Sequence, residues 1–375
     1  MLKNMWYVAC DVGDVTDKPK RVKMLGTHFV LFRDEAGKIA CLHDVCPHRG
    51  ASLGNGRIVN GCIECPYHGW QYASDGKCKK IPAHKHGEGK IPKRARVDRY
   101  PVEEKYGFVW VFVGDLPQEQ RPPLPEFPEY TDSSYRIIRG EFEWKADYAR
   151  VVENGLDFAH APFVHPSFGD KDQGEIESFE VISDEWSATA QATYVPPRPK
   201  GLWSLVRKTK SPVVANPGFH MSGALMILRV HITPKWTQTI FDVNTPIDEN
   251  TTLTRWIHCR NFFKSSLFDK DSRRRVMKTF YEDAHIIENV QPELLAVDLT
   301  EEVSVKSDGL QMAYRRMRKD FIKRGWAIDN DAVRAKVDGR RAAVVPSPVR
   351  REEPDLDWVL PEMPMKKDIR PEALH

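Results

Sequence analysis

Two short stretches of the sequence each hold a cysteine and a histidine. Cys46 and His48 lie in Cys-Pro-His-Arg-Gly and, after a gap of sixteen residues, Cys65 and His68 lie in Cys-Pro-Tyr-His-Gly-Trp. Two thiolates and two imidazoles can hold zinc, or a [2Fe–2S] cluster with one iron on sulfur and the other on nitrogen. Zinc fingers place their second ligand pair on a helix, whereas both pairs here stand in loops with Pro and Gly. The pattern therefore favours the cluster over zinc.

A second group of metal-binding types follows an expected helix over 146–160. Asp157 and His160 are three residues apart, which puts them on one face of that helix. Pro162 is expected to end the helix and to let His165 turn back beside His160. Two histidines at this spacing can bind a metal, although packing in a core is the commoner fate of a histidine. An iron that activates oxygen also needs a carboxylate ligand.

Helical periodicity indicates where that carboxylate lies. An expected helix over 269–290 has an apolar seam, and Asp283 falls on it. The other members of this seam are Val276, Phe280 and Ile287. An aspartate on an apolar face is costly unless it is paired or binds a metal, which favours Asp283 as the ligand. Asp298 is the alternative, and Glu282 and Glu288 lie off the seam, where we expect them to be solvated.

The elements that must position these side chains fall into two groups. Apolar runs broken by turns predict a small β domain with strands within 21–45, at 57–59 and at 106–113. A proline-rich linker ends it, so we divide the chain into domains 1–128 and 129–375, the second of which includes a C-terminal extension. The second domain is expected to be α+β. Its strands are expected near 187–195, 221–233, 237–244 and 252–262, and its helices over 146–160, 269–290 and 307–324.

Composition limits the partners and the compartment. Lys plus Arg number 56 and Asp plus Glu number 53 in the 375 residues, so a net charge of +3 indicates no nucleic-acid partner. No apolar run approaches the roughly 20 residues of a membrane helix, and the first residues are too short an apolar stretch for a signal peptide. An odd count of 7 cysteines is typical of a reducing compartment, which predicts a cytoplasmic protein without disulfides.

Together the two motifs resemble the Rieske non-heme iron oxygenases, specifically the catalytic α subunit of the vanillate demethylase and dicamba monooxygenase type. The resemblance runs from Trp-Tyr-Val-Ala at residues 6–9, through both cysteine-histidine loops and Asn-x-x-Asp-x-x-His-x4-His from Asn154, to Asp283. It implies an α+β fold in which a Rieske β domain precedes a helix-grip catalytic domain, an antiparallel sheet with helices. It also implies a homotrimer.

The resemblance implies two cofactors in each subunit. The [2Fe–2S] cluster would be held by Cys46, His48, Cys65 and His68, and a mononuclear Fe(II) by His160, His165 and Asp283. Asn154 and Asp157 would be catalytic, with Asp157 bridging His160 to a cluster histidine of the neighbouring subunit. A purely structural role of Asp157 is the alternative. Ala51, Tyr67 and Trp70 stand where respiratory Rieske proteins have a disulfide and a serine, so we expect few hydrogen bonds to the cluster sulfurs and a low reduction potential.

The implied activity is that of a terminal oxygenase. It would use O2 and electrons from NADH or NADPH, delivered by a separate reductase with or without a ferredoxin, to monohydroxylate or oxidatively demethylate an aromatic or polycyclic substrate. The alternatives are cis-dihydroxylation of an aromatic ring, a Rieske electron-transfer protein without oxygenase activity, and a zinc-stabilised binding module. The lysine-rich stretch 77–96 either docks an acidic electron donor or is a solvated loop.

Overall fold

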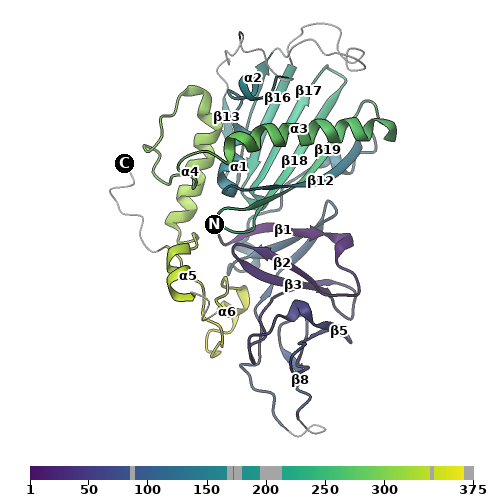
Figure 1. Ribbon diagram of the computed structural model, residues 1–375, viewed down its shortest axis with the longest axis vertical. Coiled ribbons are helices and arrows are strands. Elements are labelled where there is room, and N and C mark those ends of the chain that lie inside the picture. The colour runs from purple at the N-terminus through teal and green to yellow at the C-terminus, as the bar shows by residue number, and fades with distance from the viewer. Residues whose placement is uncertain (85–88, 167–171, 173–179, 195–212, 338–341, 367–375) are drawn as a thin grey trace. The chain divides into compact units, whose positions relative to one another are not determined.

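Three small antiparallel sheets form the N-terminal third of the chain in the computed structural model, which describes residues 1–84, 89–166, 172, 180–194, 213–337 and 342–366 (Figure 1). Their strands are β1 (Met5–Asp11), β11 (Phe108–Val113) and β10 (Val102–Lys105); β2 (Lys20–Met24), β3 (Thr27–Arg33), β4 (Ile39–His43) and β9 (Arg99–Tyr100); and β5 (Arg57–Val59), β6 (Cys62–Glu64), β7 (Gln71–Tyr72) and β8 (Cys78–Lys80). The strands expected within 21–45, at 57–59 and at 106–113 are present. The sequence prediction missed β1, whose residues 5–10 are all buried and therefore show no alternation.

The first unit combines this third with the end of the chain. Contacts divide the chain into a unit of Met1–Pro122 together with a segment that starts at Phe321, and a unit that begins at Pro123 and reaches Asp320. The division expected at 128/129 placed the C-terminal extension in the second domain, whereas its contacts lie with the first unit. Helix α4 (Gly309–Lys323) leads into this C-terminal segment, which also contains α5 (Asn330–Val337) and α6 (Pro348–Glu352).

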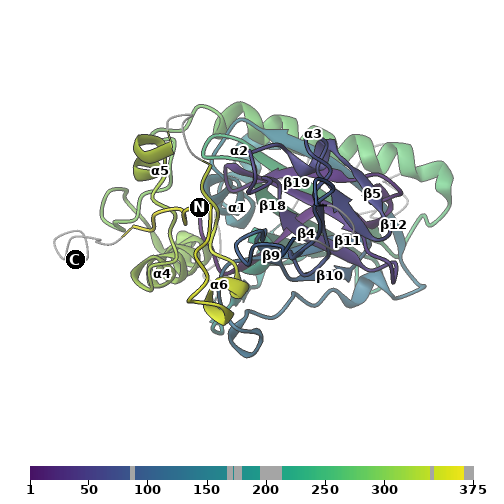
Figure 2. The ribbon, with the colours of Figure 1, turned by 90° about the horizontal axis from the view of Figure 1, so that it is seen from below.

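Specific contacts bind the C-terminal segment to the N-terminal sheets. Figure 2 shows the N-terminus beside this segment, where the amide of Ile328 donates to the carbonyl of Met1 at 2.9 Å. The guanidinium of Arg350 donates twice to Asp98, from Nε at 2.7 Å and from Nη2 at 2.8 Å, and both side chains are buried. The hydroxyl of Ser347 also donates to Asp98. A buried carboxylate needs such partners, so the segment completes the first unit.

An eight-stranded antiparallel sheet dominates the second unit. Its order is β12-β19-β18-β17-β16-β14-β13, and β15 also pairs with β16. The strands are β12 (Arg136–Trp144), β13 (Val181–Ser183), β14 (Ser187–Ala190), β15 (Ala192–Tyr194), β16 (Val213–His220), β17 (Leu225–His231), β18 (Thr237–Pro246) and β19 (Thr252–Arg260). The sequence prediction missed β12, β13 and β16, and residue 195 of its strand 187–195 lies outside the described residues. The α+β class and the order of the two domains are confirmed.

One long helix, α3 (Asp269–Ile287), lies across this sheet (Figure 1). Its predicted seam is real, because Val276, Phe280 and Ile287 are buried in one cluster with Phe142, Trp144 and Trp256 of the sheet. Gly140 of β12 makes room, since a Cβ there would stand 2.3 Å from the Trp256 ring. The close fit fixes which face of α3 turns inward. Within the described ranges, no helix has the length and apolarity to cross a bilayer.

Candidate metal centres

Two loops of the first unit close in the same way. In each loop the amide of the cysteine donates to the carbonyl of the fifth residue after it, and the glycine four residues after the cysteine donates back to the cysteine carbonyl. These bonds are Cys46 to Ala51 at 2.8 Å, Gly50 to Cys46 at 2.9 Å, Cys65 to Trp70 at 2.8 Å and Gly69 to Cys65 at 3.0 Å. Gly50 and Gly69 have φ of +76° and +70°, a backbone conformation that glycine adopts without strain. The local sequence thus builds two matching loops.

The loops turn the two residue types in opposite directions. Cys46 and Cys65 are each 2% exposed, whereas His48 is half-buried and His68 is exposed. The two imidazole rings lie 4.5 Å apart between centroids, and the Trp70 ring stacks on His48 at 4.4 Å. Burial raises the pKa of the Cys46 thiol to about 11, so the thiolate needs a bound cation. Buried sulfur with outward imidazole fits a [2Fe–2S] cluster whose histidine-bound iron faces outward.

A tyrosine hydroxyl reaches one cluster cysteine. Tyr72 Oη lies 3.3 Å from Cys46 Sγ, and burial together with Cys46 raises the pKa of Tyr72, so the hydroxyl keeps its proton and donates. The sequence-based expectation of few hydrogen bonds to the sulfurs did not include this contact from Tyr72. Only the pairing of β6 with β7, Ile63 opposite Tyr72, brings the ring back over the loops, and no local spacing signals it. Of the other cysteines nearby, Cys41 and Cys78 are buried as expected, whereas Cys62 is half-buried.

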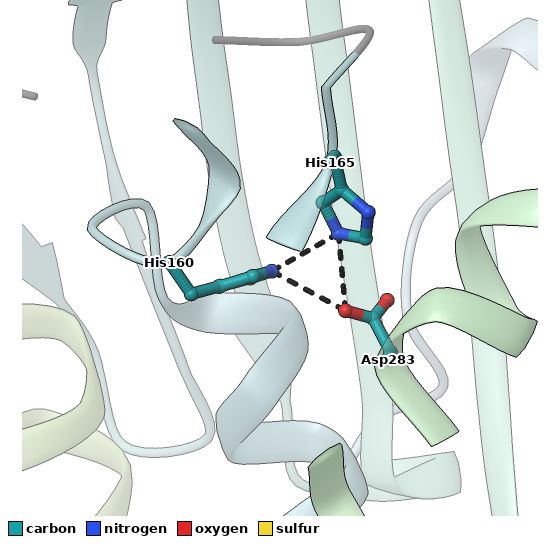
Figure 3. A group of neighbouring side chains, drawn as sticks. All are labelled: His160, His165 and Asp283. Carbon is teal, nitrogen blue, oxygen red and sulfur yellow. Dashed lines mark hydrogen bonds and ion pairs between the residues drawn. The ribbon is translucent and has the colours of Figure 1, made fainter. Parts of the chain in front are cut away.

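In the second unit three side chains converge (Figure 3). His160 Nε2 and His165 Nε2 lie 3.2 Å apart, and Asp283 Oδ1 lies 3.4 Å from the first nitrogen and 3.0 Å from the second. His165 is 3% exposed and Asp283 is 6% exposed. Three atoms with lone pairs at such distances need a shared cation, and two imidazoles with one carboxylate are the ligand set of non-heme iron. Asp298 does not join them; its carboxylate accepts from the amide and hydroxyl of Thr300.

The turn that presents the histidines differs from the expected helix over 146–160. α1 (Tyr148–Leu156) ends earlier, because Asp157 is extended and its Oδ1 accepts from the amide of Ala159 at 2.7 Å. His160 then precedes a second short helix, α2 (Ala161–Val164), and Pro162 stands in its first turn. The proline therefore starts a helix and does not end one. His165 follows α2 and turns back to His160, as predicted.

Asp157 is close to His160 without sharing a helix with it. Its Oδ2 lies 3.5 Å from His160 Nδ1. Burial opposes charge on both groups, yet the interaction with His160 holds the pKa of Asp157 below its usual value, and Asp157 and Asp283 raise the pKa of His160 to about 9. A metal at Nε2 must displace that proton. Asn154 lies on α1, and its backbone carbonyl accepts from the amide of Asp157 at 3.1 Å.

Sequence reasoning missed two acids beside this centre. The expectation of a solvated Glu282 is wrong, because its Oε2 lies 2.9 Å from His165 Nδ1 and its side chain is only 23% exposed. Glu288 is more exposed and accepts from the amide of Lys145. Asp242 of β18 is buried, and burial together with the charge of Asp283 raises its pKa well above the usual value. The seam of α3 indicates Asp283, but no periodicity shows that Glu282 reaches back to a histidine.

Comparison with known proteins identifies both parts of the chain. Residues 5–101 match the Rieske [2Fe-2S] domain, and residues 144–324 match the vanillate O-demethylase oxygenase C-terminal domain. The chain combines a Rieske domain with an oxygenase domain of the vanillate O-demethylase family. The resemblance expected from the two motifs is thereby confirmed. This family implies a [2Fe–2S] cluster and a mononuclear iron, and the donor sets of the loops and of the second unit fit them.

Individual relatives support the same assignment. The oxygenase component of dicamba O-demethylase from Stenotrophomonas maltophilia is 34% identical over 48% of this chain and 52% of that protein, so the match spans about half of that relative's length. The vanillate O-demethylase oxygenase subunit of Pseudomonas sp. (strain HR199 / DSM 7063) is 28% identical over 91% of this chain and 99% of its own. Among solved structures, Pseudomonas putida CBB5 NdmA with caffeine has a TM-score of 0.71 at 26% identity, covering 85% of this chain and 91% of that chain.

Proposed function

We propose that this protein is the terminal oxygenase of a multicomponent Rieske system, which uses O2 to monohydroxylate or oxidatively demethylate an aromatic or polycyclic substrate. The observation that carries the proposal is the convergence of His160, His165 and Asp283 in a chain that also has the two cysteine-histidine loops. Two of the relatives are named O-demethylases, which favours oxidative demethylation.

The residues take distinct roles in this proposal. Cys46, His48, Cys65 and His68 hold the cluster, and His160, His165 and Asp283 hold the iron. When bound, the cluster supplies electrons one at a time and the iron activates dioxygen beside the substrate. Asp157 orients the His160 ring from its Nδ1 side. Asn154 belongs to the same motif, and we assign it a catalytic role with Asp157.

The partners of this oxygenase are a further part of the proposal. Electrons come from NADH or NADPH through a separate reductase, with or without a ferredoxin, and the basic stretch 77–96 is a candidate docking surface, of which residues 85–88 lie outside the described residues. We also propose a homotrimer in which Asp157 joins His160 to a cluster histidine of the neighbouring subunit. Free cysteines, such as the buried Cys10 and Cys259, favour a reducing cytoplasm.

Metal analysis separates this proposal from proteins of other classes. The purified protein is expected to be brown and to contain acid-labile sulfide with three irons per chain, two in the cluster and one in the second unit. A colourless protein with zinc and no sulfide would identify a zinc-stabilised module. Cluster iron alone, with no further iron after anaerobic loading, would identify an electron-transfer protein.

A substrate screen tests the reaction itself. Aromatic acids, aryl methyl ethers, N-methylated heterocycles and polycyclic compounds are supplied with a reductase and NADH, and oxygen uptake is followed. Formaldehyde released in proportion to oxygen consumed supports demethylation, and a cis-diol product would assign the protein to the dihydroxylating members. Reduction of the cluster with no substrate-linked oxygen uptake across these classes would contradict the oxygenase proposal.

A further inference from the structure

A chain of polar contacts runs from the surface of α3 to the iron ligands. Lys278 Nζ lies 3.3 Å from Glu282 Oε1, and Glu282 Oε2 lies 2.9 Å from His165 Nδ1. On the other side of the same ring, His165 Nε2 lies 3.0 Å from Asp283 Oδ1. Exposure falls along this chain, from 52% for Lys278 to 23% for Glu282 and 3% for His165, counted for the side chains. Adjacent residues of one helix thus contact both nitrogens of one imidazole.

The contact with Glu282 fixes which nitrogen of His165 can bind a metal. A carboxylate only accepts hydrogen bonds, so the bond at 2.9 Å requires a proton on Nδ1. The neutral ring then has its lone pair on Nε2, the atom that faces His160 and Asp283. A carboxylate behind a metal-bound histidine also makes the ligating nitrogen more basic and holds the plane of the ring.

We propose that Glu282 is a positioning residue for the mononuclear iron, acting through His165. The inference rests on the proposed function, because it takes His160, His165 and Asp283 as the iron ligands. Glu282 keeps the ring in the Nδ1–H form and in the orientation that directs Nε2 at the iron. Its place directly before Asp283 means that a single turn of α3 supplies one ligand and the support of another.

The carboxylate behind each histidine lies at a different distance from the ring: Asp157 is farther from His160 than Glu282 is from His165. Asp157 Oδ2 lies 3.5 Å from His160 Nδ1, beyond a good hydrogen bond, whereas the Glu282 contact is short. The other carboxylate oxygen of Asp157, Oδ1, already accepts a hydrogen bond from the amide of Ala159. Glu282 therefore contributes chiefly to holding the iron.

A groove leaves Glu282 open to solvent beside the buried His165 ring. Glu282 and Lys278 line an open groove of about 730 Å³ on the outer side of α3, together with Phe163, Tyr281 and Ile286. Solvent in the groove hydrates the side chain of Glu282, which is 23% exposed. The alternative is that Glu282 has no role at the iron and only forms a surface ion pair with Lys278, four residues earlier on the same helix.

Iron binding by the full-length protein with its cluster in place separates these readings. The mononuclear site is emptied anaerobically, and the dissociation constant of Fe(II) is measured by competition with a chromophoric chelator. Glu282→Ala is expected to weaken Fe(II) binding by about 10- to 100-fold. Glu282→Gln is expected to cause a smaller loss, because its amide oxygen still accepts from Nδ1–H but has no charge. It also keeps the size of the side chain, so it tests the proposal even where the alanine variant fails to fold.

Two control variants remove charge from α3 without touching His165. Lys278→Met deletes the outer partner of Glu282, and Asp271→Asn removes a carboxylate that pairs with Arg274 and Arg275 on the same helix. Both are expected to bind Fe(II) within about twofold of the unchanged protein, since exposed pairs contribute little. Equal effects of Lys278→Met and Glu282→Gln would overturn the proposal in favour of a surface ion pair.

A third variant distinguishes failure of this inference from failure of the proposed function. His165→Ala is expected to abolish Fe(II) binding at the mononuclear site. If it binds Fe(II) as well as the unchanged protein does, the ligand set itself is wrong. If binding depends on His165 but both Glu282 variants bind Fe(II) normally, the ligand set holds and the role of Glu282 is refuted.

Discussion

The two candidate metal centres are built by different means. All four proposed ligands of the cluster lie within residues 46–68, in loops that close with their own backbone hydrogen bonds. The candidate mononuclear centre takes two proposed ligands, His160 and His165, from the two ends of α2. The third, Asp283, comes from α3, far later in the sequence, and joins them only when α3 packs on the sheet. A local site can be recognised from spacing, whereas a site assembled by packing requires the fold.

Replacing ligands of the second centre should give the largest effect and the clearest separation of the two. His160→Ala and Asp283→Ala are each expected to abolish substrate-linked oxygen uptake, while the visible spectrum of the cluster stays unchanged because its ligands belong to the other unit. Iron content and the spectrum are measured on the same sample. Asp298→Ala is the control; loss of the iron in this variant, with Asp283→Ala unaffected, would reverse our choice of ligand.

Asp157→Asn is expected to interrupt the proposed link between the cluster and the iron while both metals stay bound. The change keeps the size of the side chain, removes its charge and replaces one acceptor oxygen with a donor. Both metals and the reduction of the cluster by its donor should persist, while product formation falls at least ~100-fold, toward the upper end of effects seen for residues behind metal ligands. Single-turnover product yield is the measurement. Near-normal turnover, or full activity of a monomer, would contradict the bridge.

The same contrast explains what the sequence reveals. The loops around Cys46 and Cys65 could be predicted because their ligand types, prolines and glycines are all local. Asp283 could be predicted from the apolar seam of α3, since a buried carboxylate stands out there. Glu282 and Tyr72 could not, because each reaches its partner through packing or strand register. The end of α1 was misjudged because the Asp157 side chain competes with the helix for a backbone amide.

Tyr72→Phe should change the cluster more modestly. The variant keeps the aromatic ring and removes the hydroxyl that lies 3.3 Å from Cys46 Sγ. A hydrogen bond to sulfur stabilises the reduced, more negative cluster, so its loss is expected to lower the reduction potential. A potentiometric titration followed by EPR measures the change. Tyr67→Phe, at an exposed ring beside His68, is the control and should leave the potential unaltered; equal shifts would remove Tyr72 from the account.

The smallest effect expected is a difference in acid sensitivity. His43 of β4 is buried, and burial lowers its pKa to about 4, below the 6.5 of the unfolded chain. Between these values the unfolded state binds a proton that the folded state does not, so stability falls as pH decreases from 6.5 to about 4. His43→Leu should flatten this dependence by at most ~1.4 kcal/mol per pH unit. Urea unfolding at pH 7, 6 and 5 is the measurement. His285→Gln, at an exposed position on α3, should keep the original slope, and an unchanged slope in His43→Leu would refute the assignment.

The pairing of Asp98 with Arg350 has a consequence for biosynthesis. A ribosome makes the cysteine-histidine loops early, but Arg350 and Ser347, the side-chain partners of Asp98, emerge only after the whole second unit. Until then the carboxylate of Asp98, which directly precedes β9, lacks both of these side-chain partners. The first unit therefore reaches its final structure last, although it is translated first. Assembly of the cluster thus takes place either on an incomplete unit or on a nearly finished chain.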